Sequence, residues 1–175
     1  MKAPGVVVTG FMAAGKTTVG RSLARLLGCA FHDLDEVVAA REGRTPRQLI
    51  DDAGEAAFRE AETSALRAAL EGDERKVVAL GGGAWTLERN RELVRAGGFV
   101  SAWLDAPFKL CWERIQEAGS TDRPFARHLE RARALYDERR AAYSLADLRV
   151  GVTAERDADE VAAELAARLR EERGP

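Results

Sequence analysis

The sequence predicts one α/β domain with three layers, in which helices cover both faces of a central parallel sheet of about five strands. Short runs of β-branched or apolar residues alternate with longer segments of helical periodicity, and strands separated by helices form parallel sheets. The 175 residues suit one domain with a substantial core, and no repeat, linker or low-complexity tract divides them. We therefore expect residues 1–175 to form a single domain.

The boundaries of the expected elements follow from local signals. Residues 6–8 are a β-branched run, and glycines at 43 and 54 separate short helical segments. Thr45 before Pro46 is typical of an N-cap followed by proline in the first helical turn. Val161, Leu165 and Leu169 share one face of the last helix. The expected strands span residues 6–9, 29–32, 77–80, 99–104 and 148–152, and the expected helices span residues 16–27, 36–41, 45–51, 55–70, 87–96, 108–117, 129–143 and 157–171.

Residues 10–17 read GFMAAGKT, which has the spacing G-x-x-x-x-G-K-T of a phosphate-binding P-loop. Such a loop wraps backbone N–H groups around phosphates, directs its lysine to the β and γ oxygens and offers a hydroxyl to Mg²⁺. The required strand precedes the motif and an amphipathic helix follows it. A plain glycine-rich turn would leave the lysine and the two threonines unexplained. The sequence predicts binding of a nucleoside triphosphate through Gly10, Ala13, Ala14, Gly15, Lys16, Thr17 and Thr18.

Polar residues directly after the strands matter most, because ligands of such sheets bind beyond the carboxyl ends of the strands. Asp33 and Asp35 follow the second strand and Asp105 follows the fourth. One of the first two carboxylates can steady Mg²⁺ through its water shell while the other accepts a proton from an acceptor hydroxyl. The alternative is that one of them caps the next helix.

Three further segments each allow a functional and a structural interpretation. Arg59 and Glu62 form either a surface ion pair or an anion-binding arginine with the carboxylate that orients it. The glycines at 81–83 are either a loose loop or a place where backbone closely approaches a ligand. Arg123 opens an arginine-rich stretch that is either a mobile loop over phosphates or a solvated connector. Arg139 lies on a charged helix face, and Trp85 after the glycines is a candidate to line a pocket.

Taken together and in order, these motifs resemble those of the shikimate kinase family over nearly the whole chain. The matching segments are the P-loop of residues 10–20, the D-x-D of Asp33 and Asp35, and F-R-x-x-E at residues 58–62. The triple glycine follows, then the start of a lid at Arg123-Pro124, and Arg139 four residues before a tyrosine. The resemblance implies a P-loop kinase fold with a short lid at about residues 119–130.

The resemblance also implies the roles of the site residues. Asp35, Arg59 and Arg139, with Gly81, Gly82 and Gly83, would contact shikimate, whose carboxylate suits guanidinium groups. Catalysis would rest on Lys16, Asp35 and Arg123. Mg²⁺ would be held by Thr17 and, through water, by Asp33. Arg114 would stack on adenine and Arg123 would complete the phosphate site.

The resemblance implies transfer of the γ-phosphoryl group of ATP to the 3-hydroxyl of shikimate, in the biosynthesis of chorismate and aromatic amino acids. Three alternatives remain: a kinase of another polyol acid such as gluconate, a P-loop switch protein, and a paralogue of low activity. A switch is disfavoured because no guanine-reading Asn-Lys-x-Asp is present. The low-activity paralogue is considered because Phe125 and Ala126 replace two leucines in a shortened lid.

Composition limits the partners that we expect. The net charge of −2 argues against non-specific binding of nucleic acid. No apolar run is long enough to span a membrane, and the first strand begins too early to leave room for a signal peptide. Cys29 and Cys111 have no metal-ligand spacing and suit a reducing compartment. We expect a cytoplasmic monomer whose ligands are ATP, Mg²⁺ and shikimate.

Overall fold

The computed structural model describes residues 5–119 and 128–171 of the chain. In this part, five strands form one parallel sheet of order β2-β3-β1-β4-β5, which confirms the predicted fold class. The strands are β1 (Val6–Thr9), β2 (Ala30–Asp33), β3 (Lys76–Ala79), β4 (Val100–Asp105) and β5 (Leu148–Gly151). The helices are α1 (Lys16–Leu27), α2 (Leu34–Glu42), α3 (Pro46–Ala53), α4 (Glu55–Leu70), η1 (Ala84–Thr86), α5 (Glu88–Ala96), α6 (Phe108–Glu117), α7 (Leu129–Tyr143) and α8 (Ala158–Glu171).

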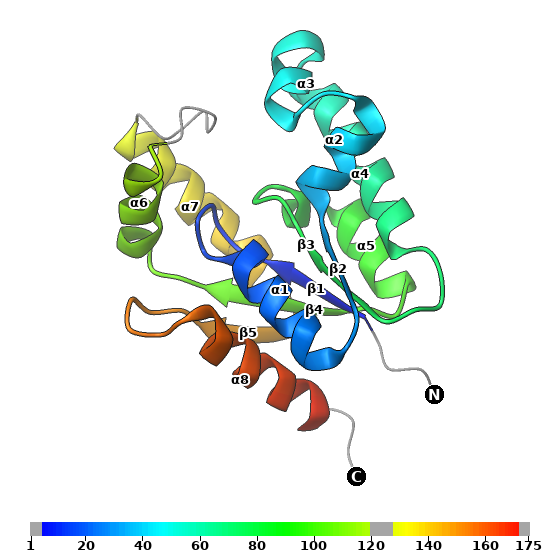
Figure 1. Cartoon of the computed structure of the whole chain (residues 1–175). Coiled ribbons are helices and arrows are strands. Elements are labelled where there is room, and N and C mark those ends of the chain that lie inside the picture. Colours follow the sequence, from blue (N-terminus) through cyan, green and yellow to red (C-terminus); the bar gives the residue numbers. More distant parts are fainter. Residues whose placement is uncertain (1–4, 120–127, 172–175) are drawn as a thin grey trace.

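The helices lie on both faces of the sheet. Figure 1 shows α1 and α8 together on the near face, with α5 and α7 behind the sheet. Right-handed crossovers explain this division, because the chain moves in opposite directions along the sheet after β1 and after β3. β1 is therefore covered on both sides, and Val6, Val7 and Val8 are fully buried.

Several predicted boundaries differ from the structure by one or two residues, among them those of β2, β3, β4 and α2, and one short helix was not predicted. β2 is shifted by one residue, since its register with β3 pairs Ala30 with Lys76 and Asp33 with Ala79. α2 begins at Leu34, two residues earlier than predicted, because the Asp33 carboxylate caps its N-terminus by accepting a hydrogen bond from the Asp35 backbone N–H. The short η1 helix after the three glycines is absent from the predicted elements.

α3 begins as the sequence predicts. The Thr45 hydroxyl accepts a hydrogen bond from the Gln48 backbone N–H, the Gln48 side chain accepts one from the Thr45 backbone N–H, and Pro46 occupies the first turn. None of the helices in residues 5–119 and 128–171 combines the length and the apolar character that crossing a bilayer would require.

Candidate active site

The site lies where the chain leaves β1 and β3 in opposite directions. These strands are hydrogen-bonded neighbours, and the Leu80 backbone N–H donates to the Val8 carbonyl at 2.9 Å. The P-loop follows β1 toward one face and the triple glycine follows β3 toward the other. Such a switch point opens a crevice at the carboxyl edge of a parallel sheet. Here the P-loop and the triple glycine meet in that crevice.

The P-loop has the backbone conformation of an anion cradle. Ala13 and Gly15 have positive φ angles of 59° and 98°, and left-handed residues of this kind occur in the backbone concavities that bind anions. A left-handed alanine is strained, and such strain is common in loops that bind ligands. Lys16 Nζ donates to the carbonyls of Gly10 and Phe11 at 2.9 and 2.8 Å. The lysine is thus held against the loop whose ligand it is predicted to neutralise.

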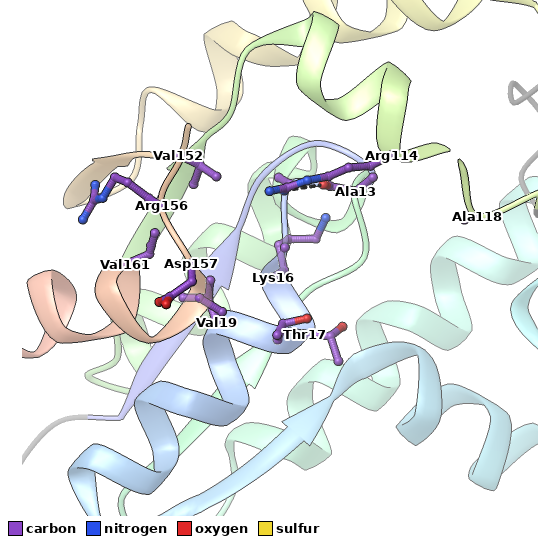
Figure 2. Close-up of a pocket in the computed structure, with 14 residues that line it drawn as sticks. Ala13, Lys16, Thr17, Val19, Arg114, Ala118, Val152, Arg156, Asp157 and Val161 are labelled. Carbon is purple, nitrogen blue, oxygen red and sulfur yellow. Dashed lines mark hydrogen bonds between the residues drawn. The ribbon is translucent and has the colours of Figure 1, made fainter. Parts of the chain in front are cut away.

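A cavity of about 490 Å³ opens beside the P-loop (Figure 2). Arg114 of α6 lies on one side and donates through Nη1 to the Ala13 carbonyl at 3.2 Å. The predicted nucleotide residues that line it are Ala13, Ala14, Gly15, Lys16, Thr17, Thr18 and Arg114. Gly10 lies outside this lining, and a Cβ atom there would come within 2.8 Å of the Leu104 carbonyl oxygen.

The opposite side of this cavity comes from the β5–α8 connection, whose residues are not among the predicted site residues. Val152, Arg156 and Asp157 line it, together with Val161 of α8. Arg156 donates to the Gly151 carbonyl and to Glu164 Oε2, both at 2.7 Å. These residues lie far from the P-loop in sequence, and no motif marks them.

A second cavity, of about 550 Å³, lies on the other side of the P-loop lysine. It is lined by Asp33 and Asp35, by residues of α3 and α4, by the triple glycine and by Arg139 of α7. Ala13, Lys16 and Thr17 line both cavities. The two spaces therefore meet at the lysine and the threonine.

The triple glycine makes room for the charged side chains of this second cavity. A Cβ atom on Gly83 would lie 2.7 Å from Arg59 Cζ, and one on Gly82 would lie 3.1 Å from an Arg139 guanidinium nitrogen. A Cβ atom on Gly81 would lie 3.0 Å from a Glu62 oxygen and 3.2 Å from an Asp35 oxygen. None of the three glycines has a positive φ angle, so space rather than backbone conformation requires them. The interpretation as a loose loop is wrong.

Glu62 is buried, so the interpretation of Arg59 and Glu62 as a surface ion pair is also wrong. The Glu62 side chain is 1% exposed, and Arg59 Nη1 donates to its Oε1 at 2.8 Å. Its Oε2 has no hydrogen-bond partner within the described chain. Burial raises the pKa of Glu62, the Arg59 guanidinium lowers it, and the Asp35 charge raises it again. Arg59 is held in the cavity by a carboxylate behind it.

Thr17 and Asp33 form an oxygen pair at the junction of the two cavities. The Thr17 hydroxyl donates to Asp33 Oδ2 at 2.7 Å, and the other oxygen of Asp33 caps α2. The helix cap considered for Asp33 is therefore present, and Oδ2 is the oxygen that could face the water of a metal ion. Hydroxyl and carboxylate oxygens fit Mg²⁺, which keeps several waters and takes few protein ligands.

Arg139 is surrounded by contacts that hold the end of α7. The Tyr143 hydroxyl donates to the Gly82 carbonyl at 2.6 Å, and Trp85 Nε1 donates to the Ala142 carbonyl at 2.9 Å. Burial raises the pKa of Tyr143 to about 12, against the opposing effect of the nearby Arg139. Trp85 is 3% exposed and packs in the core rather than lining either cavity.

The predicted lid spans about residues 119–130, of which the structure describes 119 and 128–130. Arg123 and its neighbours lie outside the described residues. The role of Arg123 stays a prediction.

Comparison with known proteins agrees with this geometry. Residues 12–170 match the model of the shikimate kinase family. The chain is 41% identical over 169 residues to the shikimate kinase of Geobacter sulfurreducens, covering 95% of this chain and 91% of the relative. It is 40% identical over 175 residues to that of Symbiobacterium thermophilum, covering 97% and 99%.

Solved structures give the same result. The shikimate kinase from Acinetobacter baumannii in complex with shikimate superimposes with a TM-score of 0.89 at 30% identity, covering 98% of this chain and 96% of the other. A gluconokinase from Sinorhizobium meliloti gives a TM-score of 0.65 at 22% identity, covering 98% and 94%, which is a likeness of fold alone.

Proposed function

The chain belongs to the shikimate kinase family, and we propose that it transfers the γ-phosphoryl group of ATP to the 3-hydroxyl of shikimate. One observation supports this proposal independently of family membership. The cavity beside the P-loop and the cavity that contains Arg59 and Arg139 meet at Lys16 and Thr17. A nucleotide in the first would present its terminal phosphate to an acceptor in the second.

The acceptor cavity suits a hydroxylated carboxylic acid. Arg59 and Arg139 supply two guanidinium groups that bind a carboxylate through paired hydrogen bonds. Asp35 is the carboxylate available to orient a ring hydroxyl and accept its proton as that oxygen bonds to the γ-phosphorus and ADP leaves. The backbone of Gly81, Gly82 and Gly83 forms the cavity wall between these groups.

The P-loop side supplies charge for the transferred group. Lys16 would leave the carbonyls of Gly10 and Phe11 to contact the β and γ oxygens, and Arg114 would lie beside the base. Thr17, and Asp33 through water, would hold Mg²⁺, which would supply positive charge to the phosphate oxygens. Arg123 of the lid would complete the phosphate site. Little covalent chemistry is required of the protein.

The test is steady-state kinetics with Mg-ATP in an assay coupled to ADP formation, with shikimate and gluconate as separate acceptors. We expect saturable turnover with shikimate and none above background with gluconate. Phosphorylation of gluconate but not shikimate would overturn the acceptor. Binding of both ligands without turnover would instead identify a paralogue of low activity.

The acceptor arginine gives a sharper prediction. Arg139→Ala is expected to raise KM for shikimate by roughly one to two orders of magnitude, because a charge-assisted pair of hydrogen bonds is lost. KM for ATP should stay near the wild-type value. Arg133→Ala, at an exposed position of the same helix, is the matched control. An unchanged KM for shikimate in Arg139→Ala would show that this arginine does not hold the carboxylate.

We also propose that the protein works as a monomer in the cytoplasm. Support for the compartment comes from Cys29 and Cys111, which are not joined by a disulfide bond, as is typical of cysteines in a reducing environment. Light scattering after size exclusion should give a mass near 19.1 kDa. A mass of twice that value would show that the protein is a dimer.

A further inference from the structure

Asp105, at the end of β4, binds two arginines from different elements. Its Oδ1 accepts a hydrogen bond from Arg140 of α7 at 2.7 Å. Its Oδ2 accepts bonds from Nε and Nη2 of Arg149 of β5, at 2.9 and 2.5 Å. The two guanidinium groups lie over the ring of Trp103, 5.0 and 4.9 Å from its centroid. None of these four residues lines the acceptor cavity.

The two arginines differ in what they attach to the sheet. Arg149 belongs to β5, which is already paired with β4, so its bond joins two neighbouring strands. Arg140 belongs to α7, and its bond joins that helix to the end of β4. Arg140 Nη1 also donates to the Tyr136 hydroxyl, which in turn donates to the Ala106 carbonyl, both at 2.8 Å. Arg140 is therefore the centre of a polar attachment of α7 to the end of β4.

The residue before Arg140 is the predicted acceptor arginine. Leu135 and Arg139 of α7 line the acceptor cavity, while Arg140 points to the other side of the helix, toward Asp105. Consecutive residues of a helix point about 100° apart, so rotation or displacement of this turn would move both guanidinium groups. β4 pairs with β1, the strand that leads into the P-loop. The position of Arg139 relative to Lys16 thus depends on how α7 is held to β4.

We propose that Arg140 is a positioning residue, which through Asp105 holds α7 against β4 and thereby directs Arg139 into the acceptor cavity. The part that concerns acceptor binding rests on the proposed function. The part that concerns the attachment of α7 does not. Asp105 is 12% exposed, so the bond is better shielded from solvent than a surface ion pair.

The experiment compares Arg140→Met with Arg149→Met. Each removes the one guanidinium group that contacts both Asp105 and the ring of Trp103, but only the first removes a bond between α7 and β4. In Arg140→Met we expect KM for shikimate to rise about tenfold, with kcat and KM for ATP changed less than about twofold. In Arg149→Met we expect both KM values to stay near wild type. Arg140→Lys should recover part of the loss, because its ammonium group can still reach Asp105.

A second measurement needs no substrate. Hydrogen exchange of the backbone amides at residues 139–144 should speed up in Arg140→Met and stay unchanged in Arg149→Met. Asp105→Asn should behave as Arg140→Met does, and the double variant should add little to either single change. Equal effects of the two methionine variants, or unchanged exchange in Arg140→Met, would overturn the proposal. Failure of the wild type to use shikimate would overturn the proposed function. The exchange measurement would still test whether Arg140 holds α7 to β4.

Discussion

Gly83 lies where a single methyl group would meet the guanidinium of Arg59, with 2.7 Å between the added carbon and Arg59 Cζ. Its backbone angles, φ −100° and ψ −14°, are open to any residue. An alanine there would therefore leave the backbone unchanged and displace the arginine. The role of Arg59 can therefore be tested by a substitution at Gly83 that leaves the arginine itself in the sequence.

We expect Gly83→Ala to raise KM for shikimate about tenfold or more, since a charge-assisted contact is lost. The free energy of unfolding should also fall, by about 1 to 3 kcal/mol, because displacing Arg59 weakens its bond to the buried Glu62. Gly151→Ala is the control, because a Cβ atom there meets nothing within 4 Å and the φ angle is not positive. Wild-type kinetics in Gly83→Ala would mean that Arg59 is not needed where the structure puts it.

The raised pKa of the buried Glu62 makes the stability of the fold depend on pH. Its folded-state pKa is raised above 4.5 by burial, so the native state holds its proton more tightly than the unfolded chain does. The stability from that proton is fully present below the unfolded-state pKa and is lost as pH rises through the folded-state pKa.

The glutamine introduced by Glu62→Gln carries no such proton and does not titrate. The unfolding free energy of wild type minus that of Glu62→Gln should therefore fall as pH rises above about 4.5. Urea denaturation at several pH values measures this difference. Glu60→Gln, at an exposed position of the same helix, controls for the loss of a negative charge. A difference that rises with pH over this range would contradict the assignment.

At the level of secondary-structure elements, α3 closes one side of the acceptor cavity with few buried contacts of its own. Pro46, Arg47, Ile50 and Asp51 line the cavity, and Leu49 is the residue of this helix that enters the core. An eight-residue helix is marginal in isolation, so its capping box contributes a large share of its local stability. The helix that shapes the acceptor site thus depends on two polar side chains outside the cavity.

Thr45→Ala should lower the free energy of unfolding by about 1 kcal/mol, because the Gln48 N–H loses its acceptor. Chemical denaturation measures the change. Thr45→Ser keeps the hydroxyl and should stay within about 0.5 kcal/mol of wild type. Equal losses in the two variants would show that the methyl group, and not the cap, is what matters.

Across the whole molecule, the nucleotide and acceptor cavities share the P-loop, so a ligand bound there should stabilise the complete fold. Mg-ATP at about 100 times its Kd should add about 2.7 kcal/mol to the unfolding free energy. Lys16→Ala should lose most of that gain at the same ligand concentration and should have no measurable turnover. Lys109→Ala, whose side chain is 88% exposed in wild type, should retain both. Full activity in Lys16→Ala would remove the P-loop lysine from the mechanism.

The architecture could be predicted because its signals are local. The alternation of short apolar runs with helical segments indicated the five strands, the P-loop identified the end of β1, and Thr45 with Pro46 located the start of α3. The order of the strands was not predictable in this way, because pairing joins segments far apart in the chain. The boundaries of β2 shifted by one residue because the partner strand, rather than local propensity, sets the register.

Residue types and short spacings were enough to establish a P-loop, alternating strands and helices, and an ordered set of charged residues and glycines that resembles one kinase family. Such features can be identified from the sequence without knowledge of the folded structure. The folded chain was needed to show that the three glycines make room for Glu62, Asp35, Arg139 and Arg59, that Glu62 is buried, and that Asp105 holds α7 through Arg140. These facts depend on distances between residues that are far apart in the sequence, and such distances exist only once strand order and helix packing have brought the residues together.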